Sequence, residues 1–296
     1  MKGGQDMYAD LHLHTKYSDG KLSVSDTIGV ANDKGISILS ITDHDSVDGV
    51  EEAIQQSQLL GINCISGLEL SCRNENTEIS FPDDISIHLL AYNIDYENHQ
   101  LLSYLKHYHS KRKGILLSLI DELINEGFDA KYDDIYIISG TQMRIQDIIN
   151  HINSSFAYKE KRERLLTIAN GYYKRLFSID CTLENAIKLI KNAGGLPVLA
   201  HAFYSYKDYD IIENNQEEVY SLLDYLCELG IQGIEVFYSR FSDIQTKWLL
   251  QEARSRNLEI TVGSDFHGTP SRKDMMNYEI AEIAHSVGKL LEINRY

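Results

Sequence analysis

Short apolar runs alternate with helical stretches along most of this chain, and this alternation constrains the fold more than any other feature. The strand-like runs are residues 8–14, 36–42, 62–66, 86–93, 196–200, 233–237 and 259–263. Between most of them lie helical patterns, such as residues 23–34 with a Ser23/Asp26 capping pattern, and residues 183–193 closed by Gly194. The alternation indicates parallel βαβ units, and therefore a barrel or an open doubly wound sheet.

The chain's 296 residues, 43% of them hydrophobic, match the size of one α/β barrel domain. Residues 97–180 interrupt the alternation with helical, charged and Tyr-rich sequence. We therefore expect a barrel domain formed by residues 1–96 and 181–296, with residues 97–180 as a helical insertion that lies over the active site as a lid. A purely structural cover is the alternative for this insertion.

The net charge of −16 argues against binding to extended duplex nucleic acid or to an anionic membrane surface. Residues 1–6 lack an apolar signal core, and no apolar run reaches the length of a membrane span, so we expect a cytoplasmic protein. The four cysteines form no Cys-x-x-Cys pair, which favours reduced thiols. The oligomeric state is not predicted.

A His-x-His pair, His12 and His14, ends the first strand-like run. Because side chains alternate faces along a strand, the two imidazoles point to the same side and can bind one metal ion together. His107 and His109 have the same spacing inside a helical pattern, where their side chains diverge by about 200°. The strand context therefore makes His12 and His14 the candidate ligands.

Further candidate ligands stand where the other strands end. They are Asp19, His44, Glu69, His201, Asp265 and His267, and His88 joins them from within the run at residues 86–93. Ligands gather at the carboxyl ends of strands in parallel α/β folds, so these distant residues can converge on one site. Taken singly, His88 could be a core histidine and Asp265 a turn residue, but their recurrence at nearly every strand end favours a metal site.

The nine candidates exceed the needs of a single zinc ion, which implies more than one metal. Imidazoles and carboxylates without a thiolate suit Mn²⁺, Fe²⁺ or Zn²⁺. Glu69 is the expected bridging group because a carboxylate has two oxygens. Asp43, beside His44, is expected to orient a ligand rather than to bind metal, although it could instead cap the following helix.

These motifs resemble those of the PHP (polymerase and histidinol phosphatase) superfamily. The segments that carry the resemblance are His12-x-His14, Ser18-Asp19-Gly20, Thr42-Asp43-His44, Gly67-x-Glu69, Ala200-His201 and residues 263–268. Residues 233–239 and the insertion further resemble the stand-alone branch of 3′,5′-nucleotide bisphosphate phosphatases and 5′–3′ exoribonucleases of short RNA.

The resemblance implies a distorted (β/α)7 TIM-like barrel that holds three divalent metal ions. One ion would be bound by His12, His14, Glu69 and Asp265, a second by Glu69, His88 and His201, and a third by Asp19, His44 and His267. The expected activity is metal-dependent hydrolysis of phosphomonoesters, either of nucleotide bisphosphates or at the 5′ ends of short RNA, by a metal-bound hydroxide. A histidinol-phosphate-like phosphatase and a non-catalytic, metal-bound accessory module are the alternatives.

Two arginines are the candidate phosphate-binding residues, because a guanidinium can hold a phosphate through two parallel hydrogen bonds. They are Arg144 and Arg240. The chain departs from the family pattern nearby, with Gln146, Ala202 and Phe241 at positions where the branch usually has His, Pro and His. These departures concern the choice of substrate more than the hydrolysis itself.

Overall fold

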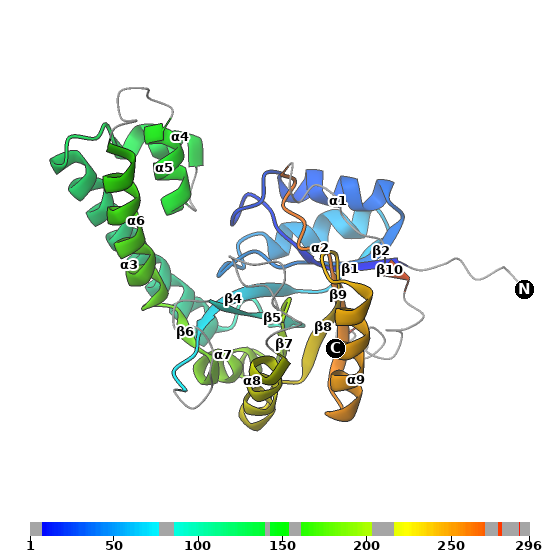
Figure 1. Cartoon of the computed structure of the whole chain (residues 1–296). Helices are drawn as coiled ribbons and strands as arrows, with labels where there is room; N and C mark the ends of the chain where they lie inside the picture. The colour runs from blue at the N-terminus through cyan, green and yellow to red at the C-terminus, as the bar shows by residue number, and fades with distance from the viewer. Residues whose placement is uncertain are drawn as a thin grey trace, which may run out of the picture. The chain divides into compact units, whose positions relative to one another are not determined.

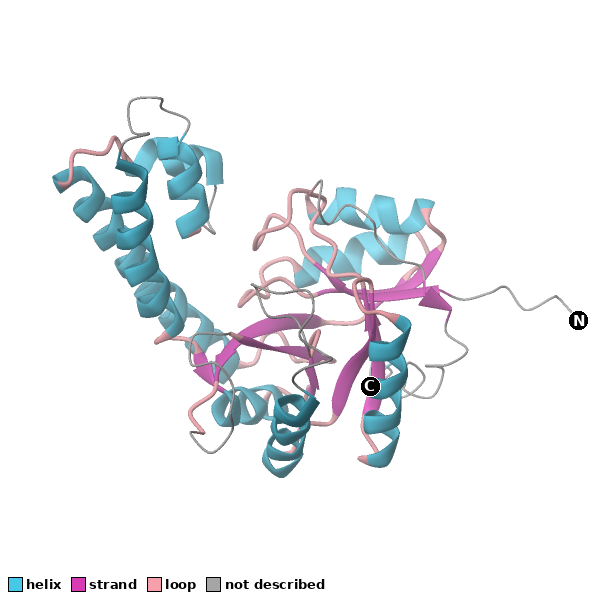
Figure 2. Ribbon diagram, in the orientation of Figure 1, coloured by secondary structure: helices cyan, strands magenta, loops and turns pink. Residues whose placement is uncertain are grey.

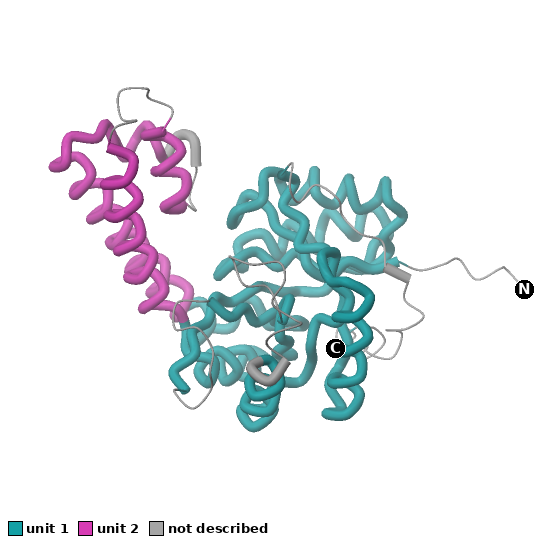
Figure 3. The backbone as a smooth tube through the Cα atoms, viewed as in Figure 1, with its two compact units in different colours: residues 1–102, 181–296 teal, residues 103–180 magenta. Residues whose placement is uncertain are grey.

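The structure of the chain is a computed structural model (Figure 1), which describes residues 8–76, 86–139, 143–153, 161–202, 216–269, 278–279 and 290; for residues 136–139, 216–218 and 278–279 it describes only the backbone. The chain divides into two compact units (Figure 3), residues 1–102 with 181–296, and residues 103–180. All described strands belong to the first unit, and the described part of the second is helical (Figure 2). The function of residues 97–180 as a lid stays a prediction.

Strands and helices alternate along the first unit, as the apolar periodicity predicts. Its strands are β1 (Tyr8–Leu13), β2 (Ile36–Ile41), β3 (Asn63–Cys64), β4 (Gly67–Arg73), β5 (Ile87–Tyr92), β6 (Cys181–Thr182), β7 (Leu196–Leu199), β8 (Gly233–Tyr238), β9 (Glu259–Gly263) and β10 (Tyr278–Glu279). Its helices are α1 (Val24–Asp33), α2 (Val50–Leu59), α7 (Leu183–Asn192), α8 (Gln216–Leu229) and α9 (Asp243–Ser255). Helix α1 begins after Ser23, whose Oγ accepts a hydrogen bond from the Asp26 N–H, so the predicted cap is confirmed.

The strands form two sheets, ordered β10-β1-β2-β3 and β6-β4-β5-β7-β8-β9. Isolated bridges join the sheets at two places, between Leu13 and Phe266 and between His44 and Glu69. Following the ladders and bridges around gives a ring of β1, β2, β4, β5, β7, β8 and β9. This is the expected distorted (β/α)7 barrel, although no continuous ladder closes it within the described residues.

Two strand assignments differ from the sequence-based expectation. Glu69 lies inside strand β4, and not in a loop that follows a strand at residues 62–66. Gly67 is the first residue of β4, and only a glycine fits there, because a Cβ would lie 2.5 Å from Ser40 Oγ and 3.0 Å from the Ala91 carbonyl oxygen. Strand β5 is antiparallel to both β4 and β7, a direction that apolar periodicity does not reveal.

Two apolar clusters hold the barrel strands together. One gathers buried side chains from β1, β2, β5, β7 and β9, among them Leu11, Leu90 and Val262. The other packs Ile28 of α1 and Ala53 of α2 against β2. Burial of this kind is the main stabilising contribution to such a sheet, and it leaves the strand ends available for polar side chains.

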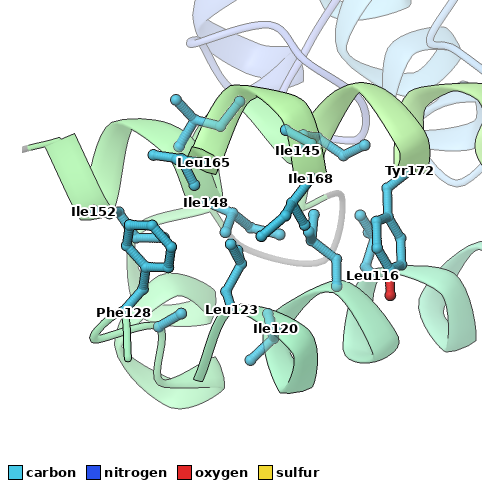
Figure 4. Packing of buried hydrophobic residues seen from close by; sticks show 14 of the residues in the cluster. Leu116, Ile120, Leu123, Phe128, Ile145, Ile148, Ile152, Leu165, Ile168 and Tyr172 are labelled. Atoms are coloured by element: carbon cyan, nitrogen blue, oxygen red, sulfur yellow. The ribbon is translucent and has the colours of Figure 1, made fainter. Parts of the chain in front are cut away.

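The second unit has an apolar core of its own (Figure 4). It contains most of α3 (His99–Asn125), together with α4 (Tyr132–Ser139), α5 (Ile145–Asn153) and α6 (Arg162–Phe177). Leu123 of α3, Ile148 of α5 and Ile168 of α6 are buried together in this core. His107 and His109 both lie on α3, so the predicted helical context of this pair is confirmed. None of the described helices is long and apolar enough to cross a membrane.

Candidate metal centre

The strand ends of the barrel bring all nine candidate ligands together. His12 belongs to β1, Glu69 to β4 and His88 to β5, and the other six follow β1, β2, β7 or β9. Because β5 runs against its neighbours, its second residue lies at the same edge as the carboxyl ends of the parallel strands. The antiparallel strand therefore places His88 with the other candidates.

The buried carboxylate of Glu69 lies at the middle of the cluster. Its Oε2 atom is 3.1 Å from His12 Nε2 and 3.2 Å from His14 Nε2. His44 Nδ1 is also 3.2 Å from this oxygen. The Nε2 atoms of His12 and His14 lie 3.1 Å apart, so the two imidazoles converge as strand periodicity predicts.

The second oxygen of Glu69 serves another pair of imidazoles. Oε1 lies 2.9 Å from His88 Nδ1 and 3.0 Å from His201 Nε2. One carboxylate thus contacts ring nitrogens on both of its oxygens, which is the geometry expected of a bridging ligand. Its role as a bridge between metal ions stays a prediction.

The loop after β9 contributes Asp265 and His267. Asp265 Oδ1 lies 3.2 Å from His14 Nε2, and His267 Nε2 lies 2.9 Å from Asp19 Oδ1. His267 Nδ1 is 2.8 Å from the backbone oxygen of Asp265, which accepts its proton and leaves Nε2 as the ligand atom. Asp265 has a φ of +54°, a conformation that non-glycine residues rarely adopt outside special sites.

This donor set fits divalent metal ions. Four groups of candidate ligands have donor atoms within 4.8 Å of one another. They are His14 with Asp19, His44 and His267; His12 with Glu69 and His201; His12 with His14 and Asp265; and His44 with Glu69 and His88. Imidazole nitrogens and carboxylate oxygens are ligands that Mn²⁺, Fe²⁺ and Zn²⁺ accept. The number and identity of the ions, and their partition among the nine residues, stay predictions.

The titration behaviour of the cluster also indicates a site for cations. Burial alone would raise the pKa of Glu69, but the imidazoles around it outweigh this effect and hold the pKa well below its usual range. For His14, burial opposes protonation, yet hydrogen bonds to Asp265 and Glu69 raise the pKa to about 10. Burial lowers the pKa of His44 to about 3. Glu69 therefore stays ionised in spite of its burial, and an ionised carboxylate can bind a metal ion.

Asp43 contacts the loop that follows β1, and its expected role in orienting a ligand stays a prediction. Its carboxylate accepts hydrogen bonds from the Thr15 N–H at 2.7 Å, the Thr15 hydroxyl at 2.6 Å and the Ser18 hydroxyl at 2.5 Å. Ser18 Oγ lies 3.4 Å from His14 Nδ1. Asp43 therefore holds the loop between β1 and α1, which carries Asp19, and reaches His14 only through Ser18.

Three buried polar residues beside the cluster were not assigned to the site from the sequence. Glu235 lies 2.9 Å from His12 Nδ1, and the Tyr238 hydroxyl donates to Asp265 Oδ2 at 3.0 Å. Asp10 Oδ1 accepts from the Ser264 N–H at 3.0 Å. A signal was available, because Glu235 is the one charged residue in strand β8 and Asp10 precedes His12 by two positions on the same strand face.

The two candidate phosphate-binding arginines lie in different units. The Arg144 guanidinium donates to both carboxylate oxygens of Asp147, at 3.1 and 3.0 Å, at the start of α5. Arg240 is half-buried in the turn after β8. Of the nearby departures from the family pattern, Phe241 packs edge-on against Tyr238 with ring centroids 4.9 Å apart. Phosphate binding by either arginine stays a prediction.

An α/β barrel with clustered imidazoles and carboxylates at its strand ends is typical of a metal-dependent hydrolase. The PHP domain model matches residues 10–295, and the chain belongs to this family. It is a metal-dependent phosphoesterase, as the resemblance implied.

Curated relatives support this assignment. A 3′,5′-nucleoside bisphosphate phosphatase from Chromobacterium violaceum is 31% identical, over 87% of this chain and 86% of the relative. A 5′-3′ exoribonuclease from Haemophilus influenzae is 25% identical, over 87% of this chain and 89% of the relative. A phosphoribosyl 1,2-cyclic phosphate 1,2-diphosphodiesterase from Eggerthella lenta is 24% identical, over 93% of this chain and 99% of the relative. The three names agree on phosphoester hydrolysis and differ in the substrate.

A solved structure shows the same fold. It is a chain from Bifidobacterium adolescentis, assigned provisionally to the metal-dependent phosphoesterases, that superposes with a TM-score of 0.72 at 22% identity. The match covers 98% of this chain and 97% of the other. The expected fold class is therefore confirmed.

Proposed function

We propose that this protein hydrolyses phosphomonoesters of nucleotides, with 3′,5′-nucleotide bisphosphates or the 5′ ends of short RNA as substrates. The observation that carries the proposal is the convergence of imidazole and carboxylate donors on both oxygens of Glu69. The proposed ligands are the nine residues of the cluster, and the proposed cofactor is a group of three divalent ions. Two relatives, a bisphosphate phosphatase and an exoribonuclease, support the substrate class.

The distribution of charged residues along the chain favours a site at which bound cations attract the phosphate. Residues 103–180 contain 12 basic and 10 acidic residues, whereas the remainder of the chain contains 16 basic and 34 acidic residues. A unit with such an acidic excess repels a phosphorylated substrate unless positive charge is gathered at the site. Divalent ions there would neutralise phosphoryl oxygens and lower the pKa of water, which supplies the attacking group.

The chain itself supplies binding and orientation, and no covalent nucleophile is proposed. Burial raises the pKa of the Cys64 thiol to about 12, so this thiol stays protonated at neutral pH. Burial likewise raises the pKa of Cys227. We therefore propose direct attack by water, with Arg240 and Arg144 binding phosphate groups of the substrate. Each arginine has to be tested separately, because Arg144 is also paired with Asp147.

A substrate panel tests this proposal. The panel contains adenosine 3′,5′-bisphosphate, 5′-phosphorylated RNAs of graded length, a five-membered cyclic phosphate diester and histidinol phosphate, each assayed with Mn²⁺, Fe²⁺ and Zn²⁺. We expect the highest kcat/KM for the bisphosphate or for the shortest RNAs. A preference for histidinol phosphate, or for the cyclic diester, would contradict the proposed substrate class while leaving the phosphoesterase assignment intact.

The arginine variants then test substrate binding. We expect Arg240→Ala and Arg144→Ala to lower kcat/KM for the bisphosphate at least 10-fold, without a change in metal content. Exposed arginines on α9 and α6 provide matched controls, Arg254→Ala and Arg162→Ala. An unchanged kcat/KM in either test variant removes that arginine from the proposed site.

A further inference from the structure

A buried glutamate outside the proposed ligand set contacts both strand β1 and the loop that follows β7. Glu235 is fully buried in the middle of β8. Its Oε1 atom lies 2.9 Å from His12 Nδ1, and its Oε2 atom accepts the backbone N–H of His201 at 2.8 Å. We propose that Glu235 is a positioning residue that orients both His12 and His201 for metal binding. This inference rests on the proposed metal centre and adds a residue to its support.

The contact with His12 selects the tautomer of that imidazole. A carboxylate can only accept, so the hydrogen bond places the imidazole proton on Nδ1. The lone pair of a neutral His12 is then on Nε2, the atom that lies 3.1 Å from both His14 Nε2 and Glu69 Oε2. A carboxylate behind a histidine ligand commonly fixes its ring and increases its basicity in this way.

The contact with His201 stabilises the backbone conformation of that residue. His201 has a φ of +23°, which is unfavourable for a residue with a side chain. The hydrogen bond from its N–H to Glu235 stabilises this conformation, in which His201 Nε2 lies 3.0 Å from Glu69 Oε1. Through its two oxygens, Glu235 thus acts on ligands that belong to different strand ends and contact different oxygens of Glu69.

The neighbouring strand is shaped to admit this carboxylate. Gly263 of β9 has no side chain, and a Cβ there would overlap both the His12 Cβ and Glu235 Oε1. The β8–β9 ladder is also irregular directly after Glu235, since Glu235 pairs with Thr261 and Phe237 with Val262. A bulge of this kind redirects side chains near functional sites. Local packing therefore keeps Glu235 between His12 and the His201 backbone.

A nearly isosteric substitution distinguishes a positioning role of the Glu235 carboxylate from a role in filling space. Glu235→Gln retains the volume but offers one acceptor oxygen where two donors need acceptors. If the amide oxygen accepts the His201 N–H, the amide NH₂ faces His12 Nδ1 and forces its proton onto Nε2, the proposed ligand atom. If the amide is reversed, the NH₂ faces the His201 N–H and the strained backbone loses its support.

Mn²⁺ binding to the chelator-treated full chain provides the test. We expect Glu235→Gln to bind Mn²⁺ about 10- to 100-fold more weakly than the wild type, in line with the effect of other residues that support metal ligands. Glu228→Gln, an exposed glutamate on α8, is the matched control and should bind as the wild type does. Wild-type affinity in Glu235→Gln would overturn the proposal.

A second readout needs no variant at position 235. Two-bond ¹H–¹⁵N correlation spectra of the Zn²⁺-loaded wild type, in which bound metal keeps its ligating imidazoles neutral, report which ring nitrogen of each histidine carries the proton, and the His12 signals are assigned by their absence in His12→Gln. We expect the Nδ1–H tautomer for His12, and an Nε2–H tautomer would overturn the proposal even if Glu235→Gln fails to fold. Absence of Mn²⁺ binding by the wild type would instead contradict the proposed metal centre, so the two failures are distinguishable.

Discussion

Glu69 Oε1 lies 3.0 Å from His201 Nε2, although 132 positions separate the two residues in the sequence. The contact joins the middle of β4 to the loop after β7, which are not neighbours in the sheet because β5 lies between them. The other oxygen of Glu69, Oε2, lies close to the imidazoles of His12 and His44, which come from β1 and from the loop after β2 in the other sheet. The cluster therefore depends on the closure of the barrel as much as on the strands themselves.

The central position of Glu69 predicts an unequal effect of removing different ligands. Glu69→Gln should reduce the number of metal ions bound per chain by more than His88→Ala does. The two carboxylate oxygens of Glu69 lie close to five imidazoles, whereas the His88 ring lies close to one of these oxygens, Oε1. Elemental analysis of the purified variants measures this number, with Glu97→Gln as an exposed control. If Glu69→Gln binds as many metal ions per chain as the wild type does, Glu69 is not a ligand of the metal centre.

Asp43 is expected to act on the site through the loop that carries Asp19. In Asp43→Asn the carboxamide cannot accept all three hydrogen bonds from Thr15 and Ser18 with its single oxygen. We expect an unfolding free energy lower by about 1–3 kcal/mol and weaker binding of one metal equivalent. Urea unfolding and metal titration measure the two effects. Asp48→Asn, an exposed neighbour, should change neither, and a similar effect in both variants would contradict the assignment.

The buried carboxyl of Asp10 predicts a specific pH dependence of stability. Burial raises its pKa from 3.8 to about 7, so between these values the folded chain binds the Asp10 proton and the unfolded chain does not. Asp10 therefore destabilises the metal-free fold progressively from pH 4 to pH 7, by at most about 4 kcal/mol. The difference in unfolding free energy between Asp10→Asn and wild type should rise over this interval.

Urea unfolding of chelator-treated protein at several pH values checks the Asp10 prediction. Asp33→Asn, an exposed aspartate on α1, should differ from wild type by the same amount at every pH. A constant difference for Asp10→Asn as well would show that Asp10 ionises in the folded chain as it does in the unfolded chain.

The apolar core of the helical unit predicts a stability effect that does not alter the metal centre. Ile148 is fully buried in this core, so Ile148→Ala should cost about 2–5 kcal/mol and Ile148→Val about 0.5–1.5 kcal/mol. Circular dichroism during urea unfolding measures the loss, and the metal content should not change. Trp248 on α9, the one tryptophan of the chain, reports separately on the first unit. A loss of bound metal in Ile148→Ala would contradict this prediction.

The sequence predicted the His12 and His14 pair well, because their relationship depends only on strand periodicity. It also predicted the gathering of candidate ligands at one edge, since strand direction and strand ends follow from the βαβ pattern. The departures from this pattern were not visible. Periodicity gives no direction for β5, and the expected strand at residues 62–66 did not reveal that β4 begins at Gly67 and contains Glu69.

The residues that support the ligands were harder to predict, because their partners are distant in the sequence. Glu235 contacts a histidine 223 positions away, and nothing near it in the chain indicates that partner. Asp43 was expected to orient a ligand, but its partners were not visible in the sequence, because it accepts hydrogen bonds from a loop 25 to 28 positions earlier. Such contacts are set by the closure of the barrel, which local patterns do not encode.

The catalytic role of the metal centre is tested most directly by phosphate release from adenosine 3′,5′-bisphosphate, measured with chelator-treated protein before and after addition of Mn²⁺. We expect no release without metal, release after reloading, and loss of both metal and activity in Asp265→Asn. The exposed control Asp243→Asn should behave as the wild type does. Undiminished release by the metal-free protein, or by Asp265→Asn, would contradict the claim that this cluster of histidines and carboxylates is the catalytic centre.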